Sequence, residues 1–161
     1  MRLTRKPTPA TLLIAACLAG LPAAVVLGPS TALAVDTMTS TDAPDLASVR
    51  AKIKAKNFSA ALADLKSIAD SVQHPDVYSL MGFSFRKTGD YATALTFYKK
   101  ALDFDPNHKG AREYLGELYV ETGDLVKARE QLAVLTQLCP QGCEEREDLE
   151  QALAAAAPKV N

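Results

Sequence analysis

Residues 75–108 read PDVYSLMGFSFRKTGDYATALTFYKKALDFDPNH and residues 109–142 read KGAREYLGELYVETGDLVKAREQLAVLTQLCPQG, so a pattern returns after 34 residues. Six positions are identical in the two copies: Gly82 and Gly116, Thr88-Gly89-Asp90 and Thr122-Gly123-Asp124, Ala94 and Ala128, and Pro106 and Pro140. Identities at small and turn-forming residues, with variation elsewhere, are typical of a repeated supersecondary unit. The stretch therefore predicts a repeat architecture, and it favours a binding role over catalysis.

Each copy is predicted to be a pair of helices. From Asp45 onward the apolar residues recur at steps of three and four, a spacing that indicates helices and no strand. Between the two helices of the first copy, Gly89 can adopt the left-handed conformation that ends a helix, and Asp90 can cap the next one. The buried faces are expected to be Tyr78, Met81 and Phe85 on the first helix and Ala94, Tyr98 and Ala101 on the second.

Gly82 lies inside the first predicted helix, where a glycine costs about 1 kcal/mol relative to alanine. A helix tolerates that cost where another backbone must approach closely. The small Ala94 is the expected partner across the hairpin, and Gly116 with Ala128 repeats the arrangement.

These residues together resemble the tetratricopeptide repeat family, and specifically a small exported bacterial member of it. That family places a small residue and then an aromatic in its first helix, alanines in its second helix, and a proline at the turn between repeats. The resemblance implies an all-α, right-handed solenoid of about three helix-turn-helix repeats with a C-terminal capping helix. Two positions depart from the pattern: Arg112 replaces the large apolar residue seen at Tyr78, and Leu135 replaces the second small alanine.

The repeat domain is expected over residues 45–156. Its units are a degenerate first repeat at 45–74, clear repeats at 75–108 and 109–142, and a cap at 143–156, followed by a tail at 157–161. A shift of 33 rather than 34 residues aligns Ala61-Leu62 with Ala94-Leu95, which identifies the degenerate unit. The cap carries five acidic residues between Glu144 and Glu150, and negative charge at a helix N-terminus suits the helix dipole.

The N-terminus has the pattern of a signal peptide over residues 1–34. Three basic residues precede an apolar run, and Ala32 and Ala34 form a small-x-small cleavage site before Val35. An uncleaved anchor and lipidation at Cys17 are the alternatives, and either would be the chain's only membrane contact. Residues 35–44 are expected to be a flexible linker. We therefore expect an exported, periplasmic protein, with a membrane-anchored protein or lipoprotein as the weaker alternatives.

Charge argues against a nucleic-acid partner. Removing residues 1–34 takes away three basic and no acidic residues, so the formal net charge falls from −1 to −4. Nucleic-acid-binding domains usually show a basic patch or stripe.

Cys139 and Cys143 are the two cysteines that remain after cleavage. An even count in an exported protein points to a disulfide. Residues four apart near a helical turn have Cα atoms roughly 6 Å apart, which a disulfide accepts. The bond would pin the cap to the solenoid, with an entropic stabilisation of about 2 kcal/mol. A redox-active pair or a metal site are the alternatives. The spacing differs from the usual Cys-x-x-Cys, and zinc needs about four ligands.

The resemblance also implies a partner groove, formed mostly by the first helix of each repeat. Carried onto this sequence, its positions are Arg50, Lys54, Ser79, Phe83, Arg86, Lys87, Glu113, Glu117 and Glu121. The basic groups come first and the three glutamates form one acidic stripe, so the groove would divide by charge, with Phe83 as an apolar anchor. It departs from the carboxylate-clamp type of this family, because acidic side chains occupy places where that clamp needs basic ones. The alternative is an ordinary solvated helix face.

No catalytic arrangement is expected, and neither is a cofactor or a metal site. The sequence has no Gly-rich phosphate loop after a strand and no nucleophile elbow. His74 and His108 are interpreted as exposed turn residues. The predicted function is a non-enzymatic scaffold of the cell envelope that binds a protein or peptide. The alternative is a redox or stress-linked accessory factor acting through Cys139 and Cys143.

Overall fold

The computed structural model describes residues 43–157. The predicted signal peptide, the possible lipidation position Cys17, residues 35–42 of the predicted linker and residues 158–161 of the tail lie outside the described residues.

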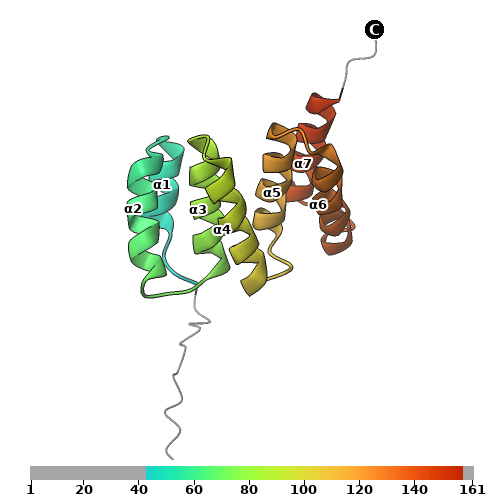
Figure 1. Ribbon diagram of the computed structural model, residues 1–161. Coiled ribbons are helices and arrows are strands. Elements are labelled where there is room, and N and C mark those ends of the chain that lie inside the picture. The colour runs from blue at the N-terminus through green and yellow to red at the C-terminus, as the bar shows by residue number, and fades with distance from the viewer. Residues whose placement is uncertain (1–42, 158–161) are drawn as a thin grey trace, which may run out of the picture. The chain divides into compact units, whose positions relative to one another are not determined.

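The described residues form helices and no strand, which confirms the prediction of an all-α repeat fold (Figure 1). None of these helices is long and apolar enough to cross a bilayer. The helices are α1 (Ala47–Lys54), α2 (Phe58–Ala69), α3 (Pro75–Lys87), α4 (Tyr91–Phe104), α5 (Lys109–Glu121), α6 (Leu125–Leu138) and α7 (Glu144–Ala156).

The helices pack as successive hairpins, α1 with α2, α3 with α4, and α5 with α6, while α7 packs against both α5 and α6. Helices α3 and α5 also contact each other directly, as do α5 and α7. The first helices of neighbouring repeats therefore line one continuous face, with α7 in the place of a further first helix.

The two tight turns within the clear repeats have the same chemistry, as the sequence predicts. Gly89 and Gly123 have φ values of +84° and +82°, a region that few other residues adopt without strain. The Asp90 side chain accepts a hydrogen bond from the Thr93 amide at 3.1 Å, and Asp124 caps α6 in the same way. The predicted end of one helix and start of the next are confirmed at both turns.

The core follows the predicted helix faces. Tyr78 and Met81 on α3 are buried, as are Ala94, Tyr98 and Ala101 on α4. Val49, Ala61 and Leu65 of the first hairpin join the same cluster as Tyr78, so this hairpin packs as part of the repeat array.

The prediction that Gly82 makes room for Ala94 is wrong. A Cβ added to Gly82 would lie 2.6 Å from two ring carbons of Tyr98, which is fully buried on α4. At Gly116 the close neighbour is Leu149 of α7, with the nearest side-chain atom 2.4 Å from such a Cβ. The two glycines thus accept different large side chains: an aromatic ring within the hairpin at Gly82 and the capping helix at Gly116.

Replacing Gly82 by alanine should destabilise the protein by about 1–3 kcal/mol, because the buried Tyr98 ring has no room to move away from a new methyl group. Urea unfolding followed by circular dichroism measures this. Gly110→Ala is the matched control, since its Cβ would meet only the His108 ring at an ordinary 3.6 Å, and alanine favours a helix. Equal stability of the two variants would contradict the packing at Gly82.

Candidate functional site

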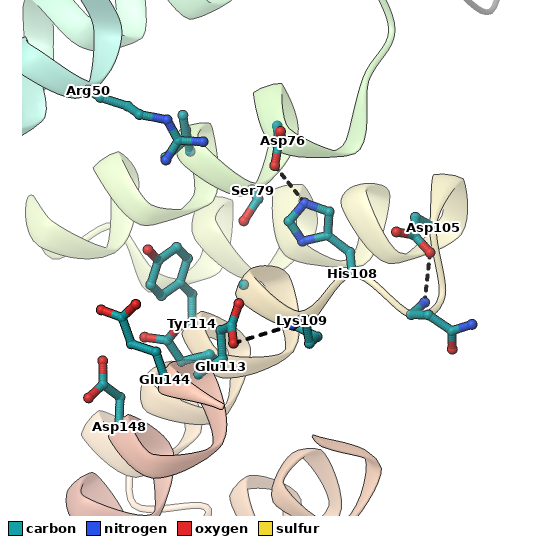
Figure 2. Close-up of a pocket in the computed structure, with 14 residues that line it drawn as sticks. Arg50, Asp76, Ser79, Asp105, His108, Lys109, Glu113, Tyr114, Glu144 and Asp148 are labelled. Atoms are coloured by element: carbon teal, nitrogen blue, oxygen red, sulfur yellow. Dashed lines mark hydrogen bonds and ion pairs between the residues drawn. The ribbon is translucent and has the colours of Figure 1, made fainter. Parts of the chain in front are cut away.

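A pocket of about 560 Å³ lies on the face formed by the first helices. The N-terminal ends of α3, α5 and α7 surround it, together with the turn between α4 and α5 and one residue of α1 (Figure 2). We call it the acidic pocket; it is lined by Arg50, Asp76, Ser79, Leu80, Asp105, Asn107, His108, Lys109, Gly110, Glu113, Tyr114, Glu144, Glu145 and Asp148.

Carboxyl groups dominate this lining. Six of the residues are Asp or Glu, whereas Arg50 and Lys109 are its only Lys or Arg residues. The Lys109 ammonium lies 3.8 Å from Glu145, so its charge is partly offset. Acidic side chains in the first turns of α3 and α7 are favourable there because the helix dipoles place partial positive charge at those ends.

His108 organises the turn that enters the pocket from α4. Its Nδ1 accepts a hydrogen bond from the Ala111 amide at 3.0 Å, so this nitrogen carries no proton, and Nε2 donates to Asp76 at 2.8 Å (Figure 2). That hydrogen bond lowers the pKa of Asp76 below its usual value. One side chain thus caps α5 and ties it to the start of α3.

The interpretation of the two histidines as exposed turn residues is wrong. His74 and His108 are both half-buried, and each caps the helix that follows it with its Nδ1 atom. The signal was present in the sequence, because the two histidines are 34 residues apart and so obey the repeat.

Glu113 is the most unusual group in the acidic pocket. The residue is only 7% exposed, and within residues 43–157 its carboxyl group has no hydrogen-bond or ion-pair partner. Burial raises its pKa to about 8, and the nearby charges of Glu117, Asp148 and Glu145 add to the effect. At neutral pH this carboxyl group is therefore mostly protonated.

The predicted groove residues do not all line the acidic pocket. Arg50, Ser79 and Glu113 line the acidic pocket, and the other six do not. Lys54 and Lys87 are exposed at the C-terminal ends of α1 and α3. The remaining four, Phe83, Arg86, Glu117 and Glu121, lie farther along α3 and α5 and interact mainly with one another.

Arg86 is a structural group rather than a free basic one. It is 2% exposed, and its guanidinium donates to Glu117 and, at 2.6 Å, to Glu121, while Nε contacts the Tyr98 hydroxyl at 3.3 Å. Burial opposes the charged form, but Tyr98, Glu117 and Glu121 together keep the Arg86 pKa above its usual value. The expected division of the groove by charge is corrected: the central basic and acidic groups pair with each other, with the guanidinium buried and the Glu121 carboxylate at the surface.

Phe83 contributes to the same network. Its ring is half-buried and lies 4.9 Å from the Tyr114 ring and 6.4 Å from the Phe58 ring, centroid to centroid. The Arg86 guanidinium lies 5.4 Å from the Phe83 centroid, within the range of a cation–π contact. Phe83 of α3 therefore packs against α2 and α5, and this structural role is separate from any contact with a partner protein.

Arg112, which departs from the family pattern, holds the turn between repeats. Its guanidinium donates to the Pro106 carbonyl at 2.8 Å and 3.1 Å and to Gln131 of α6 at 2.9 Å. Hydrogen bonds thus replace the apolar packing that Tyr78 provides in the preceding repeat.

Cys139 ends α6 and Cys143 begins α7, and both are half-buried. Their Cα atoms lie 6.0 Å apart and their sulfur atoms are at bonding distance. In the part of the chain that the structure describes, no three His, Cys, Asp or Glu side chains are grouped so that they could bind a metal ion.

The comparisons with known proteins agree with this architecture. Residues 85–153 match the family model described as tetratricopeptide repeat. Residues 85–153 therefore contain tetratricopeptide repeats. The match runs from the last turn of α3 into α7, so it includes the pocket residues of α5 and α7 but not those of α1 and α3.

Two curated relatives are both named uncharacterized protein ycf37. The one from Guillardia theta is 34% identical over 74 residues, which are 46% of this chain and 41% of that protein. The one from Pyropia yezoensis is 32% identical over 65 residues, 40% of this chain and 36% of that protein. The matched segment thus spans well under half of each relative.

Removing both acidic partners of Arg86 should cost about 3 kcal/mol, because a buried guanidinium would be left with the Tyr98 hydroxyl alone. We expect each change, Glu117→Gln or Glu121→Gln, to cost less stability alone than it costs when the other glutamate has already been replaced. Urea unfolding in a double-mutant cycle measures these free energies. Glu150→Gln, which breaks the more exposed Arg146–Glu150 pair, should cost about 0.5 kcal/mol. Additive effects at Glu117 and Glu121 would contradict a shared role.

Glu113 should make the protein less stable as the pH rises. Its pKa is about 8 in the folded state against an ordinary value of 4.5, so between these values the folded state binds the extra proton and stability falls with increasing pH. Glu113→Gln, which resembles the protonated acid, should match the wild type at pH 4 and exceed it at pH 9 in urea unfolding. Glu130→Gln on α6 is the control, and a pH-dependent gain in that variant as well would discredit the assignment to Glu113.

Proposed function

We propose that this protein is a non-enzymatic interaction module of the cell envelope that holds a segment of another protein in the acidic pocket. Tetratricopeptide repeats generally mediate binding to proteins or peptides. The observation that carries the proposal is the pocket itself. Its volume is about 560 Å³, and the N-terminal ends of α3, α5 and α7 surround it. Ligand sites typically have volumes of about 300–1,000 Å³.

The chemistry of the acidic pocket supports binding rather than hydrolysis. Ser79, His108 and Asp76 all line the pocket, and these are the residue types of a hydrolytic triad. However, His108 uses one ring nitrogen for Asp76 and the other for the Ala111 amide, so it has no nitrogen to accept a proton from Ser79. A serine without such a base is a weak nucleophile.

The location in the envelope rests on residues 1–34 and on the cysteine pair. A leader of this pattern directs export, and an oxidising compartment would keep Cys139 and Cys143 joined. A bond between them would fix the first turn of α7, which supplies Glu144, Glu145 and Asp148 to the pocket. In this proposal the disulfide is structural.

Mass spectrometry of the protein recovered from the envelope of its own cells tests export and oxidation together. We expect a chain that begins at Val35 and takes up two alkyl groups only after reduction. A chain that retains residues 1–34, or one whose cysteines are free before reduction, would count against this part of the proposal. Rapid exchange with a mild thiol would instead support the redox alternative.

Site-specific photo-crosslinking tests the binding surface. A photoreactive residue at Glu144, an exposed member of the acidic pocket, should capture a discrete protein partner in the native envelope. The matched control is Val126 on α6, which is 67% exposed and lies outside the pocket. The same products from both positions, or products from Val126 alone, would overturn the assignment of the pocket as the partner site.

A further inference from the structure

Glu113 presents to the acidic pocket a carboxyl group that no described side chain binds. Buried polar side chains in proteins are nearly always hydrogen-bonded, since a buried group without a partner costs free energy. Glu113 is 93% buried and lines the acidic pocket, yet no described residue pairs with it. Arg86, the nearest buried cation, is already shared by Glu117 and Glu121. No fully buried side-chain oxygen or nitrogen of the described residues lacks a hydrogen bond, so the Glu113 carboxyl oxygens reach the surface inside the pocket.

The surroundings of Glu113 favour a positive ligand. Glu144 and Asp148 come from α7 on one side of the pocket, and Asp76 comes from α3 on the other (Figure 2). A third carboxylate of α7, Glu145, also lines the pocket. Among these three, only Glu145 forms an ion pair with a described residue, Lys109. The Tyr114 ring next to Glu113 supplies an aromatic face, which also attracts cations.

We propose that the acidic pocket receives a basic side chain of a partner protein, a lysine ammonium or an arginine guanidinium, and that Glu113 is the carboxylate that pairs with it. This inference rests on the proposed function, since it names the chemistry of the segment that the pocket binds. A long basic side chain fits the volume of the pocket and can place its charge near the buried carboxyl group while its methylene groups cover Leu80 and Tyr114.

Binding of such a cation should release a proton. Charges on three elements act on Glu113: Glu117 on α5 itself, Arg86 on α3, and Glu145 and Asp148 on α7. The acidic groups among them help keep Glu113 protonated in the free protein, and an incoming cation reverses the balance and favours the carboxylate. Affinity should therefore increase as the pH rises from 6 toward 8.

The experiment uses the chain from Val35 onward and three probes followed by NMR titration. The probes are the blocked peptide acetyl-Gly-Lys-Gly-amide, its norleucine counterpart, and n-butylamine. We expect the lysine peptide to shift the amide signals of pocket residues and to bind more tightly than the other two probes. Equal binding of the norleucine peptide would overturn the need for a charge, and equal binding of butylamine would assign the pocket to small amines rather than a protein segment.

Glu113→Gln is the decisive variant. It should weaken the lysine peptide by at least about tenfold and abolish the rise in affinity between pH 6 and 8. Glu130→Gln makes the same chemical replacement on α6 outside the pocket, so it should bind as the wild type does. Circular dichroism confirms that both variants are folded.

The two proposals fail differently. If Glu113→Gln binds the lysine peptide as the wild type does, while crosslinking from Glu144 still captures a protein, the inference about Glu113 is wrong and the proposed function stands. If crosslinking from Glu144 captures nothing and no peptide binds, both are wrong.

Discussion

The buried guanidinium of Arg86 holds the relative positions of three helices. It extends from α3, contacts the Tyr98 hydroxyl of α4, and binds Glu117 and Glu121 on α5. Apolar contacts between stacked repeats tolerate small sliding movements. A planar, multiply bonded cation fixes direction as well as distance. This anchor joins the C-terminal parts of α3 and α5, and the His108–Asp76 hydrogen bond joins their N-terminal ends at the acidic pocket.

The same face of the protein thus contains two electrostatic regions with opposite roles. Toward the C-terminal ends of α3 and α5, the opposite charges meet and satisfy each other. Toward the N-terminal ends, carboxyl groups outnumber basic groups, and Glu113 has no described partner. The first region provides rigidity, and the second presents carboxyl groups that could bind a ligand. Their adjacency on α5 means that the glutamate stripe at 113, 117 and 121 is divided between the two roles.

Most of the fold could be predicted from the sequence because its determinants are local. The turn at Gly89-Asp90 and the helical spacing of Tyr78 and Met81 depend on neighbours in the chain. The site was harder to predict because its properties depend on contacts between helices. Nothing in the sequence around Arg86 indicates that it is buried beside Glu117 and Glu121, 31 and 35 residues away. The role of His108 was recoverable, since His74 stands one repeat earlier.

The contact between Leu149 and Gly116 also determines where the array ends. A helical repeat leaves an apolar surface on its last unit, and such a surface would accept the first unit of another molecule. Head-to-tail contacts of that kind do not close on themselves and can grow into filaments. Leu149 is fully buried over Gly116, and the first turn of α7 carries Glu144, Glu145 and Glu147. Because α7 covers the surface around Gly116, that surface is not open to a second molecule.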